Sequence, residues 1–130
     1  MQNIKFLTIE EIKKLHKALI EKFGGLYGIR DEKLLDSAIN MPKATFSDVY
    51  LHEDIYLMAA AYVYHIVKNH PFIDGNKRTG ITTAITFLFM NDMGLNISNT
   101  ELYELTIKIA TSKTTKEEVA QVFREKTFHN

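Results

Sequence analysis

The sequence predicts an all-α domain, a compact helical bundle in which a polar loop joins two buried central helices. Apolar residues recur at helical spacing along most of the chain, and residues that cap helices stand in front of these runs. No repeat, linker or low-complexity tract divides the 130 residues. We therefore expect a single domain that spans residues 1–130.

The first two expected helices carry recognisable start and stop signals. Thr8 and Glu11 form a capping-box pattern, and Gly24-Gly25 ends the helix after apolar residues at Ile9, Ile12, Leu15, Leu19 and Phe23. Asp31 can cap a second, shorter helix that Pro42 ends. Its apolar face consists of Leu34, Leu35, Ala38 and Ile39.

The two central helices are the most apolar segments of the chain. Asp54 precedes IYLMAAAYVYHIVKN, which is apolar on nearly every side and is typical of a helix in the middle of a bundle. The later stretch ITTAITFLF is rich in β-branched residues and could pass for a strand. Its apolar residues nevertheless follow a helical period, and the run from Lys77 to Asn91 is too long for an ordinary strand. We therefore expect a second central helix that stops near Gly94.

Two further helices are expected near the C-terminus, each behind a capping-box pattern. Ser98 with Glu101 precedes Leu102, Leu105 and Ile109, and Thr115 with Glu118 precedes Val119, Val122 and Phe123. Met41–Glu53 shows no sustained period and is expected to be irregular.

Composition excludes several classes of function. Sixteen basic residues balance sixteen acidic ones, so no overall field favours nucleic acid or an anionic membrane. The absence of cysteine excludes disulfides and thiolate zinc sites. The N-terminus does not resemble a secretory signal, and the longest apolar run, Ile55–Val67, is too short to span a membrane. We expect a cytoplasmic protein with no direct nucleic-acid or membrane partner.

The stretch HPFIDGNKRTG, residues 70–80, lies between the two central helices. One interpretation is a plain turn, because Asp-Gly-Asn is a strong turn signal and Lys77 and Arg78 can be solvated charges. The alternative is an anion site. If the second central helix starts near Asn76, its unpaired backbone N–H groups and the two cations favour a bound phosphate.

Two further residues of this stretch carry chemistry that suits a nucleotide. Asp74 is a suitable Mg²⁺ ligand, since Mg²⁺ prefers carboxylate together with phosphate oxygens. His70 ordinarily titrates near neutrality and can accept a proton from an attacking hydroxyl. A base, a metal ligand and an anion site together indicate group transfer from a nucleotide.

The same stretch resembles the motif of the Fic family, in which His-x-Phe is followed by an acid, Gly, Asn, Gly or Lys, and Arg. The similarity is greatest to the death-on-curing (Doc) branch, through Asn76-Lys77-Arg78-Thr79. It extends to Gly24-Gly25 and to Gly28-Ile29-Arg30-Asp31. The resemblance implies an all-helical Fic-type bundle with the active-site loop between the central helices.

The resemblance also implies roles for individual residues. His70 corresponds to the general base, Asp74 to the Mg²⁺ ligand and Phe72 to an aromatic residue that packs under the loop. Gly75, Asn76 and Arg78 correspond to the phosphate-binding elements. Lys68 is a further candidate for a phosphate contact, with a solvated helix end as the alternative. The family places a flap at Met41–Glu53, where a plain surface loop is the competing interpretation.

Two positions separate transfer of phosphate from transfer of AMP. Fic enzymes that transfer AMP usually carry Gly where Lys77 stands and a second Arg where Ile81 stands. The Doc branch shares both differences and transfers the γ-phosphate of ATP to a protein hydroxyl. The resemblance therefore implies a Mg·ATP-dependent Ser/Thr phosphotransferase in which Lys77 also belongs to the catalytic set.

The Doc branch consists of toxins that are held by an antitoxin and that halt translation by modifying elongation factor Tu. We expect the same kind of target and partner here. AMP transfer to a protein hydroxyl is the alternative reaction. A non-catalytic regulatory module that keeps the nucleotide site is the alternative from another class of function.

Overall fold

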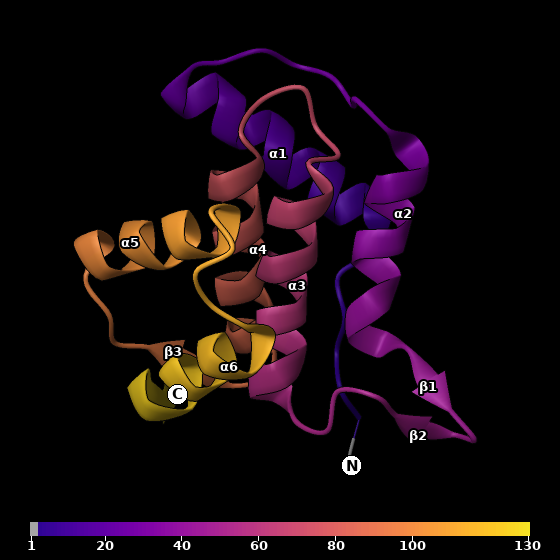
Figure 1. The fold of residues 1–130 in the computed structure, drawn as a ribbon, viewed down its shortest axis with the longest axis vertical. Helices are drawn as coiled ribbons and strands as arrows, with labels where there is room; N and C mark the ends of the chain where they lie inside the picture. The colour runs from indigo at the N-terminus through magenta and orange to yellow at the C-terminus, as the bar shows by residue number, and fades with distance from the viewer. Residues whose placement is uncertain (1–2) are drawn as a thin grey trace.

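The computed structural model describes residues 3–130 and confirms the all-α prediction (Figure 1). Its α-helices are α1 (Ile9–Phe23), α2 (Glu32–Asn40), α3 (Ile55–Asn69), α4 (Asn76–Met90), α5 (Asn99–Ala110) and α6 (Lys116–Lys126). A short 3₁₀ helix, Met41–Lys43, follows α2 directly, with Pro42 in it. The stretch with β-branched residues is thus helical, as its period predicts.

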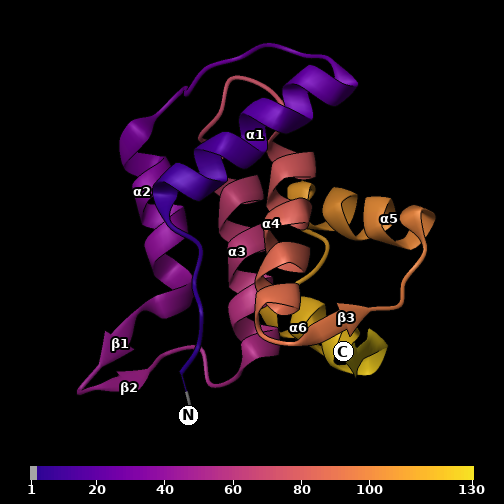
Figure 2. The same ribbon diagram turned by 180° about the vertical axis from the view of Figure 1, so that it is seen from behind.

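Helix α3 lies at the centre of the bundle. It packs against α2, α4, α5 and α6, and α1 crosses over α4 (Figures 1 and 2). Eight of its residues are buried: Met58, Ala59, Ala60, Ala61, Tyr62, Val63, Ile66 and Val67. The hydroxyl of Tyr62 accepts a hydrogen bond from the Leu7 N–H at 3.1 Å, which ties the N-terminal segment to this core.

Five of the six described α-helices begin with a side-chain cap. Asp31 and Asp54 cap α2 and α3, and Thr8 and Thr115 form full capping boxes on α1 and α6. Ser98 caps α5 by accepting the Glu101 N–H, but the Glu101 carboxylate accepts from the Ser98 hydroxyl and not from the Ser98 backbone N–H that a capping box requires. Helix α4 has no side-chain cap.

Two short antiparallel sheets were not expected from the sequence. Strands β1 (Thr45–Phe46) and β2 (Val49–Tyr50) form a hairpin within the irregular segment. Strand β3 (Met93–Leu95) pairs with β4 (Thr127–His129), with Gly94 opposite Phe128. Strands of two or three residues are too short to show a period of two, so no pattern in the sequence marks them.

The hairpin lies at the opposite end of α3 from residues 70–75 (Figures 1 and 2). A helix of 15 residues is about 22 Å long, so the two features are well separated. This placement favours a surface hairpin over a flap beside the loop.

The buried face of α1 differs from the apolar spacing in its sequence. Its buried residues are Ile12, His16 and Ile20, whereas Phe23 is 52% exposed. The last turn of α1 extends past the top of the bundle, where no helix covers it (Figure 1). The Arg78 guanidinium lies over the Phe23 ring at 4.1 Å instead.

A polar cluster joins α6 to α3 within the bundle. Lys116 Nζ lies 3.0 Å from His52 Nε2 and 3.0 Å from His65 Nε2, so the ammonium donates to two neutral imidazoles. Burial and the Lys116 charge lower the pKa of His65 to about 4 and also lower the pKa of His52. Burial likewise lowers the pKa of Lys116, against the opposing effect of Glu117.

No helix within residues 3–130 has both the length and the apolar character that a membrane crossing needs.

The histidine cluster predicts a loss of stability in acid. Because the pKa of His65 falls from 6.5 to about 4 on folding, the unfolded chain binds more protons in that range. The stabilisation by neutral His65 is complete above about pH 6.5 and is lost as the pH falls toward about 4. For one proton, the free energy of unfolding changes by at most ~1.4 kcal/mol per pH unit.

Urea unfolding of wild type and His65→Gln between pH 7 and 4 checks this expectation. The glutamine keeps an acceptor for Lys116 but does not titrate, so its free energy of unfolding should fall less steeply. His129→Gln, at an exposed position, is the matched control and should follow the wild type. Parallel curves for wild type and His65→Gln would contradict the role given to His65.

Candidate active site

Residues 70–75 form a loop at one end of α3 and α4, beside α1 and the segment that joins α1 to α2 (Figures 1 and 2). The two segments are held together by backbone pairing. Phe72 forms an isolated bridge with Ile29, and the Ile73 N–H donates to the Gly28 carbonyl at 3.0 Å. The connecting segment therefore fixes the position of the loop.

Arg30 holds the turn at His70. Its Nε donates to the His70 carbonyl at 2.6 Å, and its Nη2 donates to the Asn69 carbonyl at 2.9 Å. His70 has a left-handed backbone (φ 51°, ψ 52°) that ends α3. Within residues 3–130, no group hydrogen-bonds the exposed His70 imidazole, which leaves both ring nitrogens available.

The side chain of Asn76 closes the loop from inside. Its Oδ1 accepts from the Phe72 N–H, and its Nδ2 donates to the Phe72 carbonyl, both at 2.9 Å. Asn76 and Phe72 are both buried. Any phosphate contact by Asn76 would therefore be expected from its backbone N–H.

The exposed Asp74 carboxylate lies against the turn that follows α1. One oxygen accepts from the Gly75 N–H at 2.9 Å, and the other accepts from the Leu26 N–H at 3.1 Å. Gly25 makes this approach possible, because a Cβ there would lie 2.7 Å from Asp74 Oδ2. Its φ of +121° independently favours glycine.

Helix α4 presents free backbone N–H groups beside this carboxylate. Its N-cap is Gly75, with a left-handed backbone (φ 77°) and no side chain to bond the first turn. No acid occupies that turn, and the exposed Lys77 and Arg78 form no salt bridge among the described residues. A helix N-terminus without a cap and with two cations is suited to bind an anion.

The predicted site residues therefore gather at one place, with one exception. His70, Asp74, Gly75, Asn76, Lys77 and Arg78 belong to the loop and to the first turn of α4. Lys68 instead donates to the Ser112 hydroxyl, beyond the end of α5. Its phosphate contact stays a prediction.

Sequence reasoning missed His16 as part of this site. His16 lies on the buried face of α1, with its Nε2 2.8 Å from the Asp74 carbonyl oxygen. Its ring stacks on Phe72 with centroids 3.9 Å apart and planes 6° apart. The available signal was a histidine four residues from both Ile12 and Ile20, on the face that the helix buries.

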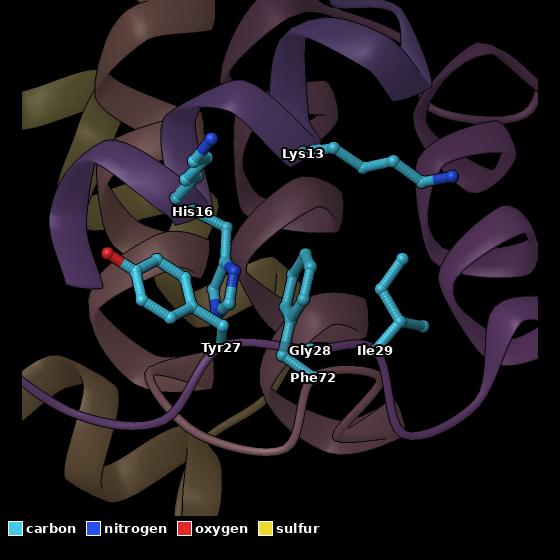
Figure 3. A pocket seen from close by; sticks show the side chains of 7 residues that line it. Lys13, His16, Tyr27, Gly28, Ile29 and Phe72 are labelled. Atoms are coloured by element: carbon cyan, nitrogen blue, oxygen red, sulfur yellow. The ribbon is translucent and has the colours of Figure 1, made fainter. Parts of the chain in front are cut away.

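An open, mostly apolar cleft of about 350 Å³ lies on the α1 side of the loop (Figure 3). Its lining consists of Lys13, His16, Lys17, Tyr27, Gly28, Ile29 and Phe72. None of His70, Asp74, Lys77 and Arg78 lines it, so the cleft does not enclose these side chains.

The side chains around the loop suit a metal ion that binds together with a phosphate-containing substrate. Residues 3–130 contain no group of three or more histidines and carboxylates that could hold a metal ion by themselves. Mg²⁺ usually binds one or two carboxylates together with the phosphates of its substrate, and a single carboxylate beside an anion site fits that pattern. Asp74 is the residue that would hold it.

Comparison with known proteins shows the family of this chain. Residues 6–88 match the model of the Fic/DOC family. The chain is 41% identical over 73 residues to "Toxin Doc" of Mycolicibacterium smegmatis, a match that covers 56% of each protein. It is 30% identical over 121 residues to "Protein kinase doc" of Escherichia phage P1, covering 93% of this chain and 94% of the phage protein. The chain belongs to the Fic/DOC family.

Proposed function

We propose that this protein is a Doc-type toxin that transfers the γ-phosphate of Mg·ATP to a Ser or Thr hydroxyl of a translation protein, with elongation factor Tu as the expected target. The observation that carries the proposal is the uncapped N-terminus of α4, which directly follows the loop that contains His70 and Asp74. The name of the phage relative, a protein kinase, adds support.

The anion site would bind the phosphates of ATP. The free N–H groups of the first turn of α4 and the cations of Lys77 and Arg78 offset phosphate charge, and Gly75 places no capping side chain over those N–H groups. Phosphoryl transfer depends mainly on positioning and on stabilising charge, so such a site supplies what the reaction requires.

His70 would act as the general base. Its imidazole has no protein partner among the described residues, while Arg30 fixes the backbone from which it projects. The attacking hydroxyl gives its proton to His70 as its oxygen bonds to the γ-phosphorus. The bond from that phosphorus to the β–γ bridging oxygen breaks, and ADP leaves.

Asp74 would hold the Mg²⁺ that accompanies ATP. Bound Mg²⁺ neutralises phosphate charge. In the free protein the Leu26 and Gly75 N–H groups already orient the carboxylate, which lies on the same side of the loop as the turn after α1. A carboxylate oriented in advance needs little rearrangement when the nucleotide binds.

Two side chains favour phosphate transfer over AMP transfer. Lys77 places a cation and its bulk in the first turn of α4, where an AMP-transferring site has glycine. Ile81 packs against the hydrophobic core and provides no second cation for the donor's phosphates. AMP transfer remains the alternative that a labelling experiment distinguishes.

An antitoxin is the expected partner in the resting cell. The proposal follows from the relative named "Toxin Doc", because a toxin of this kind must be restrained while its host grows. Co-purification with the product of the neighbouring open reading frame would identify it.

Labelled ATP tests which phosphate moves. Elongation factor Tu incubated with the protein and γ-labelled ATP should become radioactive, and α-labelled ATP should leave it unlabelled. His70→Ala should slow labelling by ~10²–10⁴-fold through loss of the base. Lys77→Ala should also reduce it, whereas Lys108→Ala, an exposed lysine on α5, should not. Transfer of the α-label by the wild type would replace phosphate transfer with AMP transfer.

Calorimetry tests the role of Asp74. Asp74→Asn preserves size but removes the charge, so the affinity for Mg·ATP should fall at least about tenfold. The melting temperature should fall only modestly, because the amide oxygen keeps one of the two backbone N–H bonds at this exposed position. Binding of ATP in EDTA should change much less. Asp48→Asn, on the exposed hairpin turn, is the matched control. An unchanged affinity for Mg·ATP would remove Asp74 from the metal site.

Growth assays test the toxin proposal. Expression without an antitoxin should arrest growth, and His70→Ala should relieve the arrest through loss of the base. His129→Ala, another exposed histidine, should remain toxic. Equal toxicity of wild type and folded His70→Ala would mean that catalysis is not the cause.

A further inference from the structure

His16 is a buried polar residue that touches the loop at two points. It is 4% exposed on the inner face of α1. Its Nε2 lies 2.8 Å from the carbonyl oxygen of Asp74, and its ring stacks nearly parallel on Phe72 at 3.9 Å. Figure 3 shows the two rings side by side at the cleft between α1 and the loop.

The first contact fixes the position of a proton. A carbonyl oxygen only accepts hydrogen bonds, so His16 Nε2 must carry a hydrogen and donate it. A buried donor of this kind is costly to leave without a partner, and the Asp74 carbonyl is the partner in this fold. The bond therefore specifies where the backbone of Asp74 lies relative to α1.

The loop is packed so closely on α1 that a small movement would be resisted. A Cβ at Gly75 would lie 3.1 Å from Ile20 Cδ1 and 3.6 Å from His16 Nε2. Phe72, under the His16 ring, is itself held by the Asn76 amide at both its N–H and its carbonyl. The stack and the hydrogen bond thus connect α1 to the two ends of the segment from Phe72 to Asp74.

We propose that His16 is a positioning residue for the Asp74 carboxylate. By holding the Asp74 carbonyl, it keeps the carboxylate against the Leu26 and Gly75 N–H groups, in the orientation that would bind the Mg²⁺ of Mg·ATP. This inference rests on the proposed function and adds to it a residue of α1 that does not touch the substrate. Outer residues that orient a ligand typically affect metal affinity about 10–100-fold.

Two substitutions separate the hydrogen bond from the stacking. His16→Phe keeps an aromatic ring on Phe72 but has no donor. His16→Gln places an amide N–H near the position of Nε2 but has no ring. If donation to Asp74 positions the carboxylate, the phenylalanine variant is the defective one and the glutamine variant is rescued.

Calorimetry with ATP in Mg²⁺ and with ATP in EDTA provides the first measurement. His16→Phe should weaken binding of Mg·ATP by about 10–100-fold and alter metal-free binding much less. His16→Gln should restore most of the Mg·ATP affinity. His65→Gln, a change of the same type on α3 outside the loop, should match the wild type. Equal loss in both media, or equal loss in both His16 variants, would reduce His16 to a packing residue and overturn the proposal.

Nitrogen NMR of the protein without nucleotide provides a second measurement, independent of any activity. The His16 ring should carry a proton on Nε2, and the Leu26 and Gly75 amide signals should shift in His16→Phe and return in His16→Gln. A ring protonated on Nδ1 alone would overturn the positioning role. If the wild type binds no Mg·ATP, the proposed function fails. If it binds Mg·ATP and His16→Phe binds equally well, only the inference about His16 fails.

Discussion

Helix α3 has almost no polar face, and the fold is arranged around the need to cover it. Burial of apolar area is the main stabilising contribution available to a chain of this size, and α3 contributes eight buried residues to it. Helices α2, α4, α5 and α6 all contact it, and the N-terminal segment is tied to its Tyr62. Because α4 must return along α3, the loop between them lies at one end of the bundle, where its side chains can reach solvent.

Buried and exposed side chains at the loop have different roles. Asn76, His16 and Phe72 are buried and face inward, where their hydrogen bonds and stacking determine the backbone. His70, Asp74, Lys77 and Arg78 are exposed and project from that backbone. Rigid support under free reactive groups is the arrangement that transfer reactions require, since misplacement of a reacting group by about 1 Å can reduce rates by 10²-fold.

Helix α4 differs from the other described α-helices because it begins without a side-chain cap. Every other described α-helix has a side chain that satisfies its first turn, at a typical benefit of about 1 kcal/mol. At α4 the N-cap residue is glycine and the first turn contains cations. The residues at this end of the helix therefore do not by themselves stabilise it. Residues that do not favour the local structure are expected at functional sites, where a bound ligand can pair with the groups that the protein leaves unpaired.

The sequence by itself determined the helices, their caps and the clustering of the candidate site, because these depend on residues near one another in the chain. Thr8, Asp31 and Thr115 cap the helices that they were expected to cap, and His70 to Arg78 are brought together by being contiguous. Only the tertiary structure decided that His16 and Arg30 hold this loop, and that Phe23 is exposed. Those outcomes depend on how α1 lies across α4 and on the pairing of Ile29 with Phe72, contacts between segments more than 40 residues apart. No local period or spacing encodes such contacts, because each is selected by the packing of the whole bundle around α3.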